Sequence, residues 1–148
     1  MKSSLILLTI TLLFSTGAFA QRIEDGSRST TGYISASGTV ENGSRSTIGY
    51  ILENGRVENG SRSTIGYITK EGRVENASRS TIGYISENGT VENGSHSTIG
   101  YVNSNGRVEN SSRSTIGYAE SVDQRHAALF FFFFFILVLE IFQHSRFA

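Results

Sequence analysis

The chain has 148 residues, with 13 Lys and Arg against 13 Asp and Glu, and it contains 16 Gly but no Pro, Cys or Trp. The absence of Cys excludes a disulfide framework, a thiolate metal site and a cysteine nucleophile. The zero net charge argues against a nucleic-acid binder that is held by phosphate attraction. The length predicts one domain, and its apolar residues are concentrated at the two ends.

Residues 1–20 have the features of a secretory signal peptide. Lys2 supplies the positive charge, Leu5 to Phe14 forms a short apolar run, and Ala18-Phe19-Ala20 fits the A-x-A cleavage pattern. We therefore expect an exported protein (periplasmic, cell-surface or secreted) whose mature chain begins at Gln21. The alternative is an uncleaved N-terminal anchor.

Residues 21–120 contain one unit repeated six times. The pair Gly-Tyr recurs every 17 residues, first at Gly32-Tyr33 and last at Gly117-Tyr118. A fixed short period is typical of a repeat architecture. Each unit has two short segments rich in β-forming residues, separated by turn residues such as Asn59-Gly60. We expect each unit to be a β-hairpin, with Asn in the left-handed position of the turn.

The register of the hairpin stays open between two alternatives. A two-residue turn pairs Glu58 with Ser61, whereas a three-residue turn places Glu58 opposite Arg62 and gives Val57, Ile65 and Tyr67 one face. The glycine within each second strand indicates a bend or a close approach of the backbone. Six short hairpins cannot be stable alone and must share a core. The sequence therefore predicts an all-β domain of six hairpins in a closed ring, or alternatively a β-solenoid.

The repeated TIGYI and RVENGSR segments behind a signal peptide resemble the bacterial β-flower proteins over about residues 22–120. The resemblance implies hairpins arranged as petals around an axis, forming a shallow barrel with an apolar central channel. It carries no established activity. The first repeat departs from the pattern, with Asp25 in place of Asn and Thr31 in place of Ile, so five-fold and six-fold closure both remain open.

Residues 121–148 form an apolar tail that includes six consecutive phenylalanines. As a helix, the uncharged run from Ala127 to Leu139 would be about 20 Å long, shorter than the roughly 30 Å core of a bilayer. The tail is a membrane anchor, a plug packed against the repeat domain, or in part the product of a slipped reading frame from Ile136 onward. The segment expected to insert or to plug comprises Leu129, Phe130, Phe131, Phe132, Phe133, Phe134, Phe135, Ile136 and Leu137.

No constellation in the sequence indicates catalysis, a cofactor or a metal. Ser-Arg-Ser-Thr recurs too regularly to be a unique nucleophile, and no His/Asp/Glu cluster has metal-ligand spacing. The repeated Arg could bind an anion, but Glu recurs at the same period, so we expect solvated Glu–Arg pairs instead. His96 takes the place of Arg in one copy and is interpreted as a surface substitution.

The repeated apolar residues are expected to pack as a core or to line a channel that holds a lipid or another apolar ligand. They are Val57, Ile65, Tyr67, Val74, Ile82, Tyr84, Ile99 and Tyr101. The sequence thus predicts a non-enzymatic exported protein with a structural or binding role, associated with a membrane through its tail. The alternative is a carrier or sensor for an apolar ligand. We expect no nucleic-acid partner, and the protein partner is left open.

Overall fold

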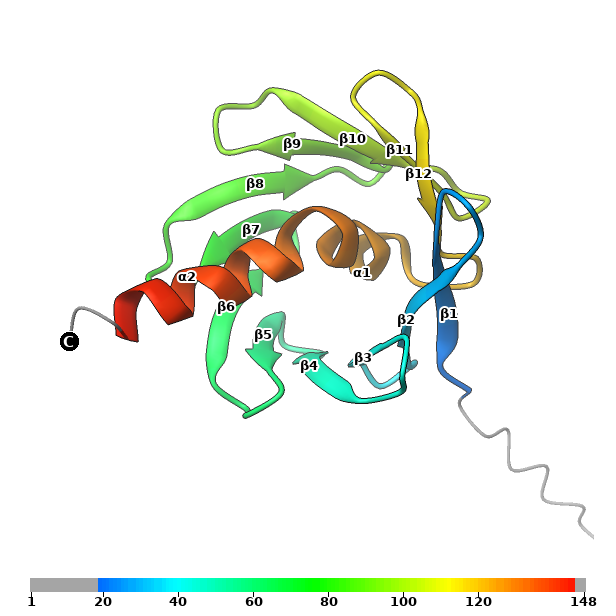
Figure 1. Ribbon diagram of the computed structural model, residues 1–148. Coiled ribbons are helices and arrows are strands. Elements are labelled where there is room, and N and C mark those ends of the chain that lie inside the picture. The colour runs from blue at the N-terminus through cyan, green and yellow to red at the C-terminus, as the bar shows by residue number, and fades with distance from the viewer. Residues whose placement is uncertain (1–18, 146–148) are drawn as a thin grey trace, which may run out of the picture.

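The computed structural model describes residues 19–145, so most of the predicted signal peptide lies outside the described residues. The chain forms strands in pairs, followed by one continuous helical segment at the C-terminus (Figure 1). The strands are β1 (Gln21–Asp25), β2 (Thr30–Ile34), β3 (Thr39–Asn42), β4 (Thr47–Ile51), β5 (Arg56–Asn59), β6 (Thr64–Ile68), β7 (Arg73–Asn76), β8 (Thr81–Ile85), β9 (Thr90–Asn93), β10 (Thr98–Val102), β11 (Arg107–Asn110) and β12 (Thr115–Tyr118). The helical segment comprises α1 (Gln124–Leu129), the π-helix η1 (Phe130–Phe134) and α2 (Phe135–Ser145).

All twelve strands belong to one closed antiparallel barrel. Each strand pairs with its neighbours in the chain, and β1 closes the ring by pairing Glu24 with Tyr118 and Asp25 with Gly117 of β12. The predicted ring of six hairpins is confirmed, and the solenoid alternative is wrong. Closure leaves no strand edge exposed, which is how a barrel avoids pairing with other chains.

The first hairpin, β1–β2, is a full member of the ring despite its divergent sequence. The Asp25 carboxylate accepts hydrogen bonds from the backbone N–H groups of Ser27 (2.9 Å) and Ser29 (3.0 Å). The Asn59 amide oxygen makes the equivalent two bonds in the third hairpin, both at 3.0 Å. Because Asp and Asn offer the same acceptor here, the replacement leaves the turn intact and the closure is six-fold.

The turn within each hairpin has three residues, but its geometry differs from the expectation for Asn. Asn59 N–H donates to the Ser63 carbonyl and Arg62 N–H donates to the Asn59 carbonyl, both at 3.0 Å. The residue in the left-handed region is Arg62, with φ of 66°. The prediction that Asn takes this conformation is wrong, because its side chain instead satisfies the N–H groups of the loop.

Neither predicted register is correct, because the turn comprises residues 60–62 and a β-bulge follows it. Glu58 pairs with Thr64 and Val57 pairs with Gly66, so Ile65 is an extra residue on the second strand. Such a bulge bends the strand and leaves the extra residue unpaired. Val57 and Gly66 therefore share the inner face of the barrel, while Glu58 lies on the outer face. Ile65 is still carried into the core, where it is 1% exposed.

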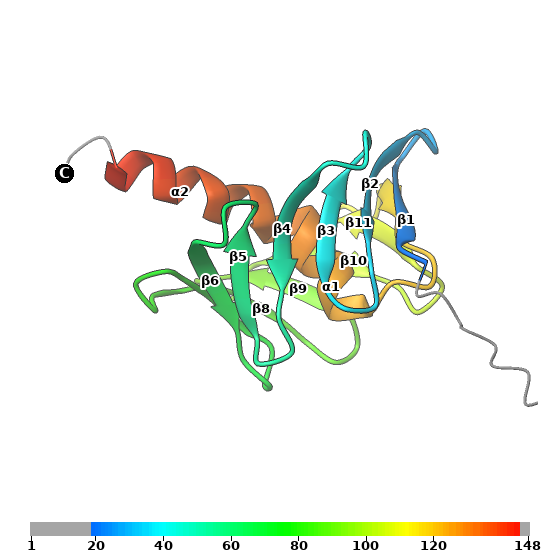
Figure 2. The same cartoon turned by 90° about the horizontal axis from the view of Figure 1, so that it is seen from below.

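The core of the barrel is completed by the C-terminal helical segment. Figures 1 and 2 show this segment passing through the ring, with α1 inside and α2 projecting from it. Its apolar side chains join the valines and isoleucines of the strands in a single buried cluster. A sheet of four- and five-residue strands with one apolar face cannot bury that face alone. The helix therefore supplies the partner surface that the ring requires.

Candidate functional site

The helical segment contacts the barrel at the glycine in the second strand of every hairpin. A Cβ atom built on any of these glycines would meet one particular side chain of the helix, at 2.9 Å for Leu137 against Gly66 and at 3.1 Å for Phe130 against Gly32. The remaining pairs are Phe131 with Gly117, Phe132 with Gly100, Phe133 with Gly83 and Phe134 with Gly49. Each hairpin therefore receives one side chain, and the missing Cβ makes room for it.

The π-helical turn matches the helix to the six-fold ring. Six hairpins are spaced about 60° apart, whereas successive residues of an α-helix step by about 100°. A π-helix has more residues in each turn, because its hydrogen bonds run to the fifth residue, so its successive side chains are separated by a smaller angle than in an α-helix. Phe130 to Phe133 consequently reach four adjacent hairpins in order. Phe134 then contacts the second hairpin, and Leu137 from α2 contacts the third.

The predicted lining residues fall on two different faces. Val57, Ile65 and Val74 are buried in the barrel, and Ile82 and Ile99 are partly buried against the same cluster. The tyrosines at 67, 84 and 101 do not line the interior. They lie on the opposite face, stacked against side chains of the next hairpin. The expectation for them is wrong, because the bulge returns Ile to the core and sends the following Tyr outward.

The predicted tail segment is also divided. Leu129, Phe130, Phe133, Phe134 and Leu137 are buried, and Phe131 and Phe132 are partly buried against the core. Phe135 and Ile136 are 54% and 50% exposed. The plug arrangement therefore describes the segment from Leu129 to Phe134 together with Leu137. Val138 and Ile141 also pack partly against the core, whereas Phe135, Ile136, Leu139 and Phe142 are exposed.

The outer face carries a repeated three-residue clamp between neighbouring hairpins. The Arg62 guanidinium lies 3.4 Å from the centre of the Tyr50 ring and bonds the Glu58 carboxylate at 3.3 Å. Tyr50 belongs to β4 of the preceding hairpin, so the contact joins two petals. The predicted Glu–Arg pairs are thus present, with an aromatic ring as a third member. The same stacking at 3.4 Å recurs for Arg28 on Tyr118, Arg45 on Tyr33, Arg79 on Tyr67 and Arg113 on Tyr101.

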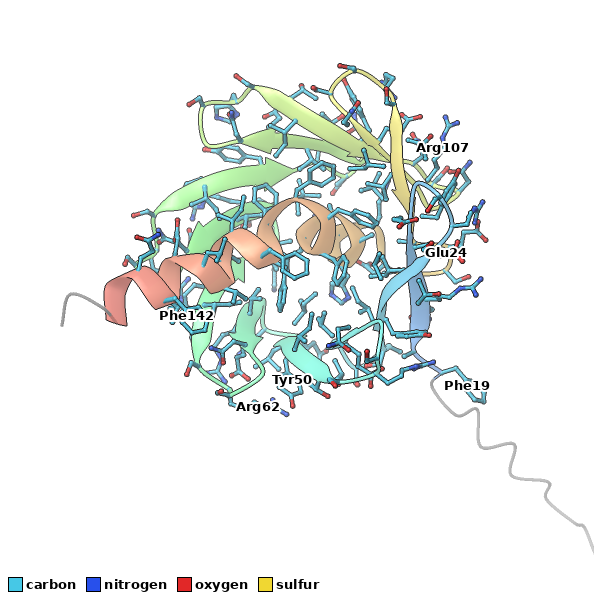
Figure 3. All side chains as sticks on the ribbon, in the orientation of Figure 1. Phe19, Glu24, Tyr50, Arg62, Arg107 and Phe142 are labelled. Carbon is cyan, nitrogen blue, oxygen red and sulfur yellow. The ribbon has the colours of Figure 1, made fainter. Side chains whose placement is uncertain are left out.

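The clamp also operates where the ring closes. Arg28 from the first hairpin stacks on Tyr118 from the last, and it bonds Glu120 at 2.8 Å and Glu24 at 3.0 Å. These two carboxylates raise the pKa of Arg28 well above its ordinary value, with Glu120 the larger cause. Glu24 is labelled in Figure 3 beside this seam. The arginines are therefore engaged within the fold, which argues against a ring of free cations for an anion.

His96 keeps the clamp in the fifth hairpin by stacking its ring in the place of the arginine. Its ring lies parallel to that of Tyr84 with the centroids 4.1 Å apart, and its Nδ1 is 2.9 Å from Glu92. It also has a positive φ, as the arginines do. The residue is therefore a substitution within the clamp, as its place in the repeat predicts.

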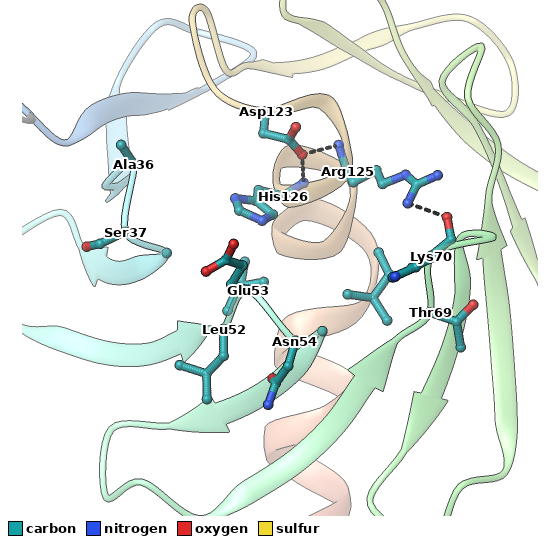
Figure 4. Close-up of a pocket in the computed structure, with 14 residues that line it drawn as sticks. Ala36, Ser37, Leu52, Glu53, Asn54, Thr69, Lys70, Asp123, Arg125 and His126 are labelled. Carbon is teal, nitrogen blue, oxygen red and sulfur yellow. Dashed lines mark hydrogen bonds between the residues drawn. The ribbon is translucent and has the colours of Figure 1, made fainter.

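A cavity of about 710 Å³ with both polar and apolar lining residues lies at the end of the barrel where α1 begins (Figure 4). Asp123 caps α1 by accepting bonds from the N–H groups of Arg125 and His126 at 2.9 and 3.0 Å, and Arg125 donates to the Lys70 carbonyl at 2.7 Å. Burial lowers the pKa of His126, and the charge of Asp123 partly opposes that shift. Among the described residues, no group of three or more His, Asp or Glu could hold a metal ion.

The opposite end of the helical segment presents an apolar stripe to solvent. Phe135, Leu139 and Phe142 are 54%, 63% and 63% exposed, and Ile136 lies beside them at 50%. The spacing of four and then three residues places the first three on one side of α2. Phe142 is labelled at the projecting end of α2 in Figure 3. We call these four residues the α2 stripe.

Sequence reasoning missed the pairing between the inner glycines and the phenylalanine run. Both signals were visible, namely a strand glycine in every repeat and six consecutive phenylalanines after the last repeat. Their connection depends on a helix that lies along the barrel axis, and no single-repeat pattern encodes that placement.

The comparison with protein-family models places the fold in a family. The model described as 5-fold beta-flower protein matches residues 20–135, which include all six hairpins, α1 and η1. No curated protein and no solved structure matched the chain. The family description names five-fold symmetry, whereas the ring described above closes with six hairpins. The chain is therefore a small structural repeat protein that belongs to the 5-fold beta-flower family.

Proposed function

We propose that the protein is an exported, non-enzymatic structural protein that attaches peripherally to a membrane surface through the α2 stripe. The observation that carries the proposal is the stripe itself, four large apolar side chains that are each at least half exposed. Large apolar surfaces of this kind mark protein or membrane contacts in soluble domains. Aromatic and aliphatic residues on one side of a helix suit the boundary between headgroups and acyl chains.

The export part of the proposal is supported by where the barrel begins. β1 starts at Gln21, directly after the Ala18-Phe19-Ala20 cleavage pattern. Cleavage after Ala20 would therefore leave every strand of the ring complete. Phe19 is 88% exposed, so this residue of the cleavage pattern lies outside the core of the barrel.

The depth of attachment follows from the plug. The helical stretch Gln124–Gln143 is long and apolar enough to cross a membrane, but 39% of its apolar 18-residue window is buried inside the protein. Only α2 projects, and its 11 residues extend about 16 Å, half of a bilayer core. While Phe130 to Phe134 pack against the strand glycines inside the barrel, we expect α2 to lie in the membrane–water interface and not to span the bilayer.

We do not propose the carrier alternative, because the interior that would hold an apolar ligand is occupied by Phe130 to Phe134 and Leu137. A ligand would have to displace the helix that completes the core. The cavity beside α1 has a mixed lining, with apolar residues such as Ile51 and Leu52 beside charged residues such as Glu53 and Lys70.

Vesicle co-sedimentation tests the attachment. The mature protein should sediment with vesicles of phosphatidylcholine and phosphatidylglycerol, and the double variant L139S/F142S should stay in the supernatant. The matched control is L52S, which removes a half-buried leucine from a loop at the opposite end of the barrel. Equal sedimentation of L139S/F142S and the unmodified chain would contradict the proposal.

Export is tested separately by expressing the full chain and measuring the mass of the protein outside the cytoplasm. The expected product begins at Gln21. Retention of the intact chain with residues 1–20 in the cytoplasm would contradict export without bearing on vesicle binding.

A further inference from the structure

The helical segment is joined to the barrel by one short linker. Between β12 and α1 lie only Ala119 to Asp123, and within them Val122 N–H donates to the Ala119 carbonyl at 3.2 Å. Glu120 bonds Arg28 through its side chain. The first turn of α1 also bonds the barrel, since Gln124 donates to the Val102 carbonyl and Arg125 to the Lys70 carbonyl, and the remaining helix contacts are apolar side chains packed in the ring. The helix is therefore attached to the barrel through one short linker, and it occupies the interior of the barrel as a separate segment would.

The fit between the helical segment and the interior of the barrel is specific at six positions. Five phenylalanines and one leucine each occupy the space of a missing Cβ on a different hairpin. A helix with another order of large and small residues would place gaps or clashes against the glycines. The segment that fits the ring is Ala127 to Leu137, and a second copy of this chain presents the same segment.

The linker holds one residue in a backbone conformation that carries a cost, as the clamp residues do. Ser121 has φ of 65°, in the left-handed region that residues with a Cβ adopt rarely. The equivalent loops between the earlier hairpins place a glycine in that region instead, at Gly38, Gly55, Gly72, Gly89 and Gly106. Short hinges under strain are those that invite exchange of an element between protomers.

We propose that the barrel accepts the helical segment of a second copy, giving a dimer in which two chains exchange their C-terminal helices. The helix passes through a closed ring, so exchange has to occur while the ring assembles. Two residue pairs join β1 to β12 at the seam, fewer than the three pairs that join β2 to β3. A ring that closes last at this seam can enclose either its own helix or that of a neighbour.

The proposal does not depend on membrane attachment and concerns the interior of the barrel alone. In the exchanged dimer every glycine keeps its partner, and Ser121 is free to leave its strained conformation. The linker keeps the chain's own helix at high local concentration. Exchange should therefore increase with protein concentration during refolding.

A complementation experiment with full-length mature chains tests the proposal. G100L fills the space of the Phe132 ring and damages the barrel but keeps a sound helix. F132D keeps a sound barrel but places a carboxylate in the core. Each variant refolded alone should give unfolded or aggregated material. Refolded together from denaturant, they should give a 1:1 dimer by native mass spectrometry in which one barrel is folded, because the F132D barrel encloses the G100L chain's helix.

The matched control mixes F131D with F132D, where both helices are faulty in any barrel and no rescue should occur. A second measurement does not require a damaged chain. Isotope-labelled and unlabelled mature protein, refolded together at increasing concentration, should form mixed dimers, and the L139S/F142S background should form them equally. Failure of G100L and F132D to rescue each other, or only monomers at the highest concentration, would overturn the proposal. Loss of the dimer in L139S/F142S would assign it to the α2 stripe instead and would also overturn it.

Discussion

The ring of Phe132 lies against the backbone of Gly100, in the space that a Cβ atom would occupy at any other residue type. This contact joins a side chain of the tail to a strand of the fifth hairpin, and five equivalent contacts serve the other hairpins. The fold of the repeat domain and the composition of the tail are therefore parts of one structure. Substitutions on either side of the contact should reveal this dependence.

Replacing Gly100 with Ala should lower the free energy of unfolding by about 1–3 kcal/mol, because the added methyl overpacks the Phe132 ring. Urea denaturation measures the change. The control is Gly94→Ala, in the turn of the same hairpin, where φ is not positive and where the fourth hairpin already has Ala77. It should change stability by less than about 0.5 kcal/mol. Equal effects of the two substitutions would show that the inner glycine is not a packing site.

The partner side of the contact gives a second prediction. Phe132→Ala should cost about 3–5 kcal/mol, the range for removing a large aromatic side chain from a core. Phe135→Ala removes the same atoms from a neighbouring residue that is 54% exposed, and it should cost far less. Thermal unfolding followed by circular dichroism separates the two. A similar loss for both would contradict the assignment of Phe132 to the interior.

The clamp on the outer face predicts that Arg62→Gly is more stable than Arg62→Ala. Arg62→Ala removes the stacking on Tyr50, about 0.5–1 kcal/mol at an exposed site, and keeps a Cβ in the left-handed region. Arg62→Gly removes the same contact but relieves a backbone cost of about 1–2 kcal/mol. The Gly variant should therefore be the more stable of the two in urea. The reverse order would show that the positive φ at this position carries no cost.

The paired carboxylates predict that the barrel loses stability in acid. Burial opposes ionisation of Glu109, but the hydrogen bond from Arg113 and the charges of Arg107 and Arg113 outweigh it, so the pKa of Glu109 lies below its ordinary value of 4.5. A depressed carboxyl pKa contributes stability that is present above the unfolded value and is lost as pH falls through the folded value.

Stability measured in urea should therefore fall as pH is lowered from about 5 towards 3. Glu109→Gln should reduce the steepness of that fall, since Gln does not titrate. Glu87→Gln, in an exposed turn between hairpins, is the comparison. A pH dependence unaffected by Glu109→Gln would contradict the assignment.

The sequence was sufficient for the architecture of the ring but not for its inner face. The period of 17 residues and the turn residues after Glu58 predict six hairpins, because both signals are local. The bulge at Ile65 is not local. It depends on a three-residue turn whose left-handed position falls on Arg62, a residue with no intrinsic preference for it. The outward placement of Tyr67 follows from that bulge and so could not be predicted.

The arrangement of the tail also could not be predicted from the sequence alone. Its hydropathy is compatible with a membrane anchor or a plug, because both environments are apolar. Six strand glycines favour the plug over the anchor, because together they make room for side chains of the tail. This arrangement of glycines exists only once the barrel is closed. Leu137 lies within the stretch that a slipped reading frame would produce, yet it packs against Gly66 as the phenylalanines pack against their own glycines.

The central claim is that the C-terminal helix is the core of the barrel, and a chain that ends at Val122 tests it most directly. That chain keeps all twelve strands, every turn and every Arg–Tyr clamp, and it lacks only the helical segment. The ¹H–¹⁵N spectrum of residues 21–122 should show the narrow amide dispersion of an unfolded chain, and urea should produce no cooperative transition. A dispersed β-sheet spectrum with a cooperative transition at the denaturant concentration of the full mature chain would contradict the account.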